Sequence, residues 1–239
     1  MKLGKPYLAM ECALLFGGIP GLLLWFELYS DVPFFPVLFG LLALTLLLGW
    51  SDPDLKFRPT TIPNPFRKLA LRLLAAAVGL TLITAIFYPE LLFRLPRDQP
   101  KIWIMVMILY PILSVAPQEY LFRTYFMQRY RTLFGEGSTM IWINALAFGW
   151  AHAFFLNWIA PLLSILAGWL LARTWKESKS FRRVCLEHAV YGQIVFTSGI
   201  GWFFYSGSTR AIENLSFIQV LTEFFAFSFP SLGIGLNFI

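Results

Sequence analysis

A few polar side chains in the middle of this chain could carry out acid–base chemistry, although their neighbours are apolar. The stretch APQEYLFRTYF contains Gln118, Glu119 and Arg123, and His152 and His188 follow it. These are the only 2 histidines in the sequence. Carboxylates and imidazoles transfer protons near neutral pH, and both are also zinc ligands. The pattern therefore predicts either hydrolysis by an activated water or a metal site.

The residues that must position these groups are typical of a membrane protein. Hydrophobic residues make up 58% of the 239 residues and charged residues 13%, which is too little polar material for a soluble globule. Apolar runs long enough to cross about 30 Å of hydrocarbon recur along the chain. We expect an all-α, polytopic membrane protein, a bundle of about eight transmembrane helices around a polar cavity. The expected spans are residues 7–28, 33–50, 69–89, 102–128, 139–155, 157–175, 184–205 and 215–236.

The distribution of basic residues supports this order of spans. With the spans as given, 14 of the 19 lysines and arginines fall on one side of the membrane and 4 on the other, with Arg123 inside a span. Because basic residues collect in cytoplasmic connections, both termini are expected in the cytoplasm, in the cell membrane of a bacterium or archaeon. The same distribution explains the net charge of +6 without a nucleic-acid partner. The lipid bilayer is the expected partner instead.

The chain divides at its polar connections. Residues 51–68, SDPDLKFRPTTIPNPFRK, contain four prolines that prevent a continuous helix, so we expect a cytoplasmic loop there. We predict a three-span N-terminal region over residues 1–100, a catalytic core over residues 101–208 and a C-terminal span over residues 209–239.

Ionisable groups inside spans are candidates for function, because each costs at least about 2.5 kcal/mol in hydrocarbon. Glu119 and Arg123 are four residues apart, so on a helix they share a face and can pair. Pro117, just before them, is expected to kink the span and to leave room for water. Counted from the cytoplasmic boundary, the depths of Glu119, His152 and His188 allow the three side chains to meet.

Other polar residues in the spans have structural explanations. Glu11 and Glu223 are expected to be hydrogen-bonding or boundary residues. Asn144 and Asn157 are either extra polar neighbours of the His152 helix or packing residues. Glu187 is expected in the first turn of its helix, where the helix dipole favours an acid. The small residues of NALAFGWAHAFF, which include Gly149, should let another helix approach closely.

The order of three motifs resembles the CAAX prenyl protease and bacteriocin-processing family of intramembrane proteases, also called CPBP or ABI proteins. Its motifs are Glu-Glu-x-x-x-Arg, Phe-x-x-x-His and His-x-x-x-Asn or Asp, on three spans. Glu119 and Arg123 match the second glutamate and the arginine, Phe148 and His152 match the second motif, and His188 matches the third histidine. The resemblance covers about residues 101–208. It implies a helical bundle around a water-filled cavity, in which glutamate and histidine activate a water and the third motif stabilises the oxyanion.

Two positions depart from these motifs. Gln118 stands where the family's leading glutamate belongs, and a glutamine cannot take a proton from water. Glu119 has then assumed the base role, or the chain is an inactive relative that binds substrates, or the sequence carries an engineered substitution. Gly192 stands where the asparagine belongs, so Tyr191 or Gln193 would supply the oxyanion hydrogen bond, unless Gly192 serves close helix packing.

We therefore predict an intramembrane endopeptidase that cleaves a membrane-embedded or lipidated protein or peptide precursor without a cofactor. Glu119 would be the general base on a water held by His152, with Arg123 supporting it and His188 steadying the oxyanion. One alternative is a zinc metalloprotease with Glu119, His152 and His188 as ligands. A second alternative is a catalytically inactive relative that acts as a binding or resistance protein.

Overall fold

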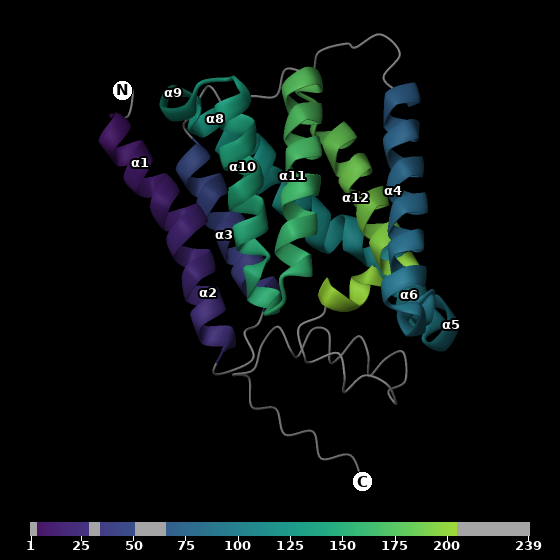
Figure 1. Ribbon diagram of the computed structural model, residues 1–239. Coiled ribbons are helices and arrows are strands. Elements are labelled where there is room, and N and C mark those ends of the chain that lie inside the picture. The colour runs from purple at the N-terminus through teal and green to yellow at the C-terminus, as the bar shows by residue number, and fades with distance from the viewer. Residues whose placement is uncertain (1–3, 29–33, 51–65, 205–239) are drawn as a thin grey trace.

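The structure, a computed structural model, describes residues 4–28, 34–50 and 66–204 as a bundle of helices without a strand in that part of the chain (Figure 1). The first helical rod consists of α1 (Lys5–Ala13), the π-helical turn η1 (Leu14–Gly18) and α2 (Ile19–Glu27), and α3 (Phe34–Gly49) follows. After α4 (Phe66–Phe87) come the short η3 (Pro89–Leu91) and α5 (Arg94–Asp98). The next rod contains α6 (Pro100–Tyr110), η4 (Pro111–Val115), α7 (Ala116–Glu119), η5 (Tyr120–Phe126) and α8 (Met127–Arg129). The remaining elements are α9 (Arg131–Phe134), α10 (Ser138–Ala151), η6 (Ala153–Phe155), α11 (Ile159–Ser178), α12 (Phe181–Ser198) and η7 (Ile200–Phe204).

The all-α membrane architecture predicted from the sequence is confirmed. Within residues 4–28, 34–50 and 66–204, three helical rods are long and apolar enough to cross a membrane, Lys5–Glu27, Arg67–Phe87 and Pro100–Arg129, and Phe34–Gly49 is a shorter apolar helix. The expected spans at residues 139–155, 157–175 and 184–205 correspond to α10 with η6, to α11, and to α12 with η7. The expected span at 215–236, Glu223 within it and most of the loop at 51–68 lie outside the described residues.

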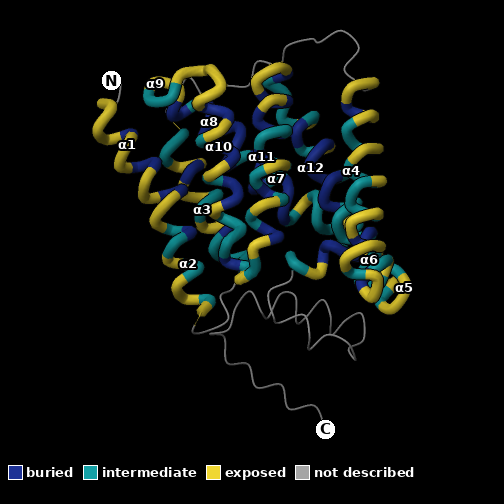
Figure 2. Tube along the Cα trace, in the orientation of Figure 1, coloured by how far each residue is buried: buried dark blue, intermediate teal, exposed yellow. Residues whose placement is uncertain are grey.

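Apolar side chains cover the outside of the bundle as well as its core. Figure 2 shows exposed positions along the outer faces of α1, α2 and α4, and buried positions concentrated in α8, α10, α11 and α12. On α4 the exposed positions recur every three or four residues, at Leu71, Leu74, Val78, Leu82 and Ile86. Such a stripe is unfavourable in water but matches a hydrocarbon solvent. The outer face of α4 is therefore a lipid-facing surface.

The helix ends that carry basic residues form two groups, one at each end of the bundle. The starts of α1, α4 and α12 and the ends of α8 and α11 lie at the upper end in Figure 1, while α5 lies at the lower end. The upper group includes Arg67, Arg129, Lys176 and Arg182, and the lower group includes Arg97. The described chain thus separates its basic residues in the manner predicted, and the upper end remains the predicted cytoplasmic one.

A buried ion pair between Glu11 and Arg129 links helix α1 to the core. Glu11 of α1 accepts hydrogen bonds from the hydroxyls of Tyr125 (2.7 Å) and Tyr130 (3.0 Å) and from Arg129 Nη2 (2.9 Å). Its role is structural hydrogen bonding, as the sequence predicted.

The prediction for Glu187 was wrong. Helix α12 begins at Phe181, with Ser180 as its N-cap, so Glu187 lies beyond the first turn, where the helix dipole has faded. Its side chain is fully buried, lies 3.2 Å from Arg72 Nη1 of α4 and accepts a hydrogen bond from Thr174 of α11 at 2.7 Å. An intramembrane carboxylate requires such partners, and here they join α4, α11 and α12.

Helices α10 and α11 are in close contact, as the run of small residues predicted. A Cβ atom added at Gly149 would overlap the Ile165 side chain and lie 2.9 Å from the Pro161 carbonyl oxygen. From the other side, a Cβ at Gly168 would lie 3.2 Å from the Ala145 Cα atom. Side chains larger than hydrogen at these positions would push the two helices apart.

We expect Gly149→Ala to lower the free energy of unfolding by about 1 to 3 kcal/mol, because the added methyl group overpacks this interface. Thermal unfolding in detergent micelles would measure the loss. Gly79→Ala is the matched control, since a Cβ at Gly79 of α4 meets nothing within 4 Å. A Gly149→Ala protein as stable as the Gly79→Ala protein would contradict this account of the interface.

Candidate active site

The candidate site is built on the irregular rod from Pro100 to Arg129. Pro111 and Pro117 lack the backbone N–H that an α-helix needs, and π-helical turns lie on both sides of the single α-helical turn α7. Such turns are frequent at functional sites. They place Gln118 and Glu119, which point about 100° apart on a helix, against different neighbours. The α7 turn contacts α3 on one side and α12 on the other.

Glu119 lies at the centre of a buried polar network and is wholly buried. Its Oε1 atom accepts a hydrogen bond from His188 Nδ1 at 2.7 Å, and its Oε2 atom lies 3.3 Å from Arg123 Nε. The distance to Arg123 fits an ion pair, but neither of those two atoms completes a hydrogen bond. The attraction is therefore chiefly electrostatic, and the predicted pairing of Glu119 with Arg123 is present.

Arg123, also wholly buried, is held by helix α10. Its Nη1 atom donates to Asn144 Oδ1 at 2.8 Å, and the Asn144 amide donates in turn to the Phe122 carbonyl at 2.7 Å. The guanidinium also lies over the Phe148 ring, 4.8 Å from its centroid. The sequence left Asn144 open between a packing residue and a polar neighbour of the His152 helix. It orients the guanidinium, and its position one turn before Phe148 was the available signal.

His188 has a partner on each ring nitrogen. Because a carboxylate can only accept a hydrogen bond, the Nδ1 atom of His188 carries a hydrogen and donates to Glu119. In the neutral ring Nε2 has no hydrogen, so it accepts a hydrogen bond from the Tyr110 hydroxyl at 3.1 Å. Tyr110 was missed in the sequence analysis. It is 78 residues from His188 in the chain, and no motif marks it.

His152 takes its orientation from the end of α10. The backbone N–H of His152 bonds to the Gly149 carbonyl, which leaves the Phe148 carbonyl without its usual helical partner. The His152 ring supplies one, since Nδ1 lies 2.7 Å from that oxygen. A carbonyl can only accept, so Nδ1 is the protonated nitrogen. In the neutral ring Nε2 is then left with a free lone pair.

The Phe148 ring contacts both His152 and a member of the network around Glu119. Its ring centroid is 4.6 Å from that of His152 and 5.6 Å from that of His188. The structure therefore brings Glu119, Arg123 and His188 together directly, and His152 shares with His188 the contact to the Phe148 ring.

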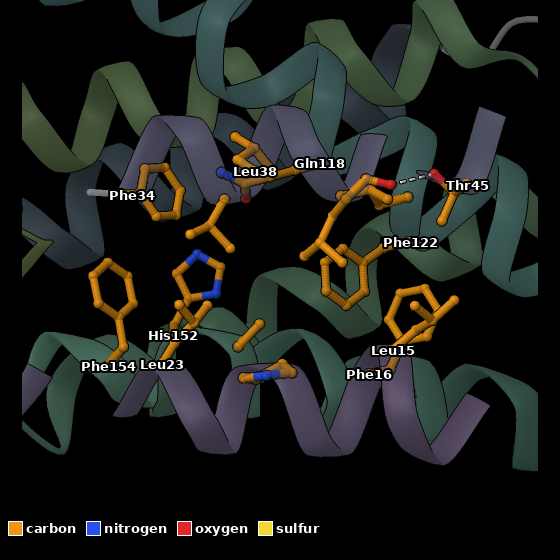
Figure 3. A pocket seen from close by; sticks show the side chains of 15 residues that line it. Leu15, Phe16, Leu23, Phe34, Leu38, Thr45, Gln118, Phe122, His152 and Phe154 are labelled. Carbon is orange, nitrogen blue, oxygen red and sulfur yellow. Dashed lines mark hydrogen bonds between the residues drawn. The ribbon is translucent and has the colours of Figure 1, made fainter. Parts of the chain in front are cut away.

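A cavity of about 60 Å³ lies on the His152 side, between α2, α3, α7 and the end of α10. Gln118 and His152 both line it, and Glu119 is not among its lining residues (Figure 3). Most of the lining is apolar, and the parallel rings of Phe34 and Phe154 are stacked beside His152. The volume suits a few water-sized molecules.

Gln118 presents an acceptor to this cavity. Its side chain is 6% exposed, and its amide nitrogen donates to Ser114 Oγ at 2.8 Å. Among the described residues its Oε1 atom has no hydrogen-bond partner, although a buried amide oxygen normally has one. Gln118 and His152 thus offer two acceptors in one cavity.

The predicted oxyanion residues have other partners. The Tyr191 hydroxyl donates to Glu187 at 3.1 Å, and the Gln193 amide donates to the Met107 carbonyl at 3.0 Å. Gly192, between them, lies against Tyr110. It therefore serves close packing, which was one of the two explanations left open.

The residues of the zinc alternative do not fit a metal ion in this arrangement. No group of three or more His, Cys, Asp and Glu side chains within residues 4–28, 34–50 and 66–204 is arranged to hold one. Both nitrogens of His188 and one of His152 have protein partners, and the Phe148 ring lies beside His152.

Residues 100–194 match the family model of the type II CAAX prenyl endopeptidase Rce1-like proteins. The family resemblance is confirmed. This Rce1-like region runs from the start of α6 into α12, and it contains the polar network and both cavity acceptors. Neither the curated proteins nor the solved structures include a match to the chain. The apolar helices and the match of the Rce1-like region to a membrane-protease family together support an integral membrane protein.

Removing one member of the buried pair in the Rce1-like region should be costly. Arg123→Met leaves the Glu119 carboxylate without its counter-charge, so we expect the free energy of unfolding to fall by about 3 to 5 kcal/mol. The double variant Arg123→Met/Glu119→Gln should lose less than Arg123→Met alone, because no charge is then left unpaired. Unfolding of the wild type, the single variants Arg123→Met and Glu119→Gln, and the double variant in one detergent would measure both effects. Losses that simply add would show that the two residues are not coupled.

Proposed function

We propose that this protein is an intramembrane peptide hydrolase that cleaves a membrane-embedded or lipidated protein or peptide precursor. The observation that carries the proposal is the cavity that His152 and Gln118 share within the Rce1-like region. A water there can donate one hydrogen to His152 Nε2 and the other to Gln118 Oε1, which leaves an oxygen lone pair for attack on a carbonyl carbon. The side chains thus hold a nucleophile without a metal or a carboxylate in the cavity.

His152 is the general base in this proposal. As the water oxygen bonds to the peptide carbonyl carbon, its proton passes to His152 Nε2, and the imidazolium then returns that proton to the leaving amine. The fixed Phe148 carbonyl supports this role, because it keeps the proton of the neutral ring on Nδ1. His188 has no ring nitrogen free to donate to the oxyanion, because Nδ1 is bonded to Glu119 and Nε2 to Tyr110. In this proposal it therefore supports the Phe148 ring that packs against His152.

The role of Glu119 differs here from the one predicted from the sequence. Its carboxylate is engaged by His188 and Arg123, and it does not line the cavity, so we assign it to positioning of His188. Glu119 as the base remains the competing assignment. It requires a water that reaches the Glu119 carboxylate, which does not line this cavity.

Turnover of a prenylated CAAX peptide and of a single-span membrane reporter in proteoliposomes would separate the two assignments. We expect His152→Ala to lower kcat by roughly 10² to 10⁴-fold, the usual contribution of a general base. Glu119→Gln, which keeps a hydrogen-bond acceptor for His188, should cost about tenfold or less. The reverse order of effects would identify Glu119 as the base. Trp158→Phe, an exposed position after the site helix, is the control for reconstitution.

A second candidate function is binding without catalysis, and the amide at Gln118 is the observation that favours it. We expect Gln118→Glu to raise kcat, because a carboxylate beside His152 would accept the water proton more readily than an amide does. Gln118→Met, similar in size but without an acceptor, is the control and should lower kcat. A wild-type protein that binds the reporters without cleaving them, next to an active Gln118→Glu protein, would establish the binding function instead.

The zinc alternative is tested on the purified protein. We expect substoichiometric zinc by elemental analysis, and turnover that survives a chelator, because the three candidate ligands are engaged by other protein groups. One zinc per chain, lost together with activity on chelation, would overturn the metal-free mechanism.

A further inference from the structure

Tyr110 lies where helix α6 ends and its hydroxyl reaches His188 across the interface with α12. The hydroxyl oxygen is 3.1 Å from His188 Nε2, and the phenol ring meets the imidazole nearly edge-on, at an interplanar angle of 81°. The same ring packs edge-on against Phe196 of α12, with centroids 5.4 Å apart. Ring contacts on α12 therefore fix the direction in which the hydroxyl points.

The Tyr110 ring fits only because residue 192 has no side chain. A Cβ atom added at Gly192 would overlap the ring carbons of Tyr110 and lie 2.6 Å from its hydroxyl oxygen. Gly192 is four residues after His188 on α12, so a side chain there would lie on the same helix face as His188. The tyrosine occupies the space that such a side chain would take.

We propose that Tyr110 and Gly192 act as one unit in which the Tyr110 hydroxyl positions His188. The inference rests on the proposed function, because it assigns a role within the same site. A polar side chain at residue 192 would reach His188 from its own helix, and here the polar group comes from α6 instead. The Tyr110 ring therefore needs a glycine at position 192. Although Gly192 differs from the asparagine of the family motif, His188 still has a hydrogen-bond partner, the Tyr110 hydroxyl.

The positions of the two hydrogen bonds explain what Tyr110 adds. Glu119 holds Nδ1 of His188 and Tyr110 holds Nε2, so the ring cannot rotate without losing both bonds. With one partner removed, the imidazole could turn about its remaining bond and lose its edge-on contact with the Phe148 ring, which packs against His152. Preorganisation of this kind affects the transition state more than substrate binding.

Tyr110→Phe removes only the hydroxyl and keeps the ring contacts. We expect kcat to fall about tenfold with KM unchanged, the size of effect expected for one hydrogen bond that orients a residue supporting the site. Tyr88→Phe is the matched control, since the Tyr88 ring packs against Phe203 in the same way and the change should leave kcat unaltered.

The exchange of side chains tests the unit itself. Gly192→Asn alone should inactivate the protein, because the new side chain collides with the Tyr110 ring. Tyr110→Ala alone should lower kcat, and the double variant Tyr110→Ala/Gly192→Asn should recover activity relative to both single variants. A double variant less active than either single variant would overturn the pairing of the two positions.

A readout independent of turnover comes from nitrogen NMR, because the protein has only 2 histidines to label. His152→Gln leaves one labelled ring and so assigns the spectrum. We expect Tyr110→Phe to shift the Nε2 resonance of His188 and to leave His152 unchanged. An unmoved His188 resonance, or an active protein whose kcat is insensitive to Tyr110→Phe, would overturn the role of Tyr110. A wild-type protein that cleaves neither reporter would overturn the proposed function instead.

Discussion

The buried carboxylate of Glu119 is the group on which the arrangement of the core depends. A charge in hydrocarbon costs at least about 2.5 kcal/mol, so its neighbours must neutralise it and bond to it. Arg123 supplies the opposite charge from the next turn, and His188 supplies a hydrogen bond from α12. Arg123 is itself buried and is held by Asn144 of α10. A single charge thereby ties together three helices that are distant in sequence.

The same constraint explains why the cavity and the charged network are separate. Gln118 and Glu119 are neighbours in sequence but face α3 and α12 respectively, and the Phe148 ring contacts the histidine on each side. The cavity side carries a neutral amide and an imidazole among apolar residues, which requires no counter-ion. On the charged side, Glu119 and Arg123 are wholly buried. The site thus combines a small cavity for water with a rigid electrostatic support next to it.

The sequence predicted the parts of this site that depend on local spacing. The four-residue separation of Glu119 and Arg123 implies a shared helix face, and the structure has the pair. The small side chain of Gly149 implies a close helix contact, and α11 makes it. Glu187 was misassigned because a carboxylate near a helix start can be stabilised either by the helix dipole or by a cationic residue on another helix. The choice depended on Arg72, which is far away in the chain.

By itself the sequence determined the helices, the separation of basic residues and the order of the three motifs, because hydrophobic periodicity and residue spacing act along one helix. Only the tertiary structure decided which neighbour each polar group meets. Tyr110 reaches His188 across 78 residues, and Tyr125 reaches Glu11 across 114. Such contacts depend on how far each helix is rotated about its own axis, and that rotation is set by packing against other helices. For this reason the sequence predicted which residues could take part in the site. It did not predict which of them line the cavity and which belong to the charged network beside it.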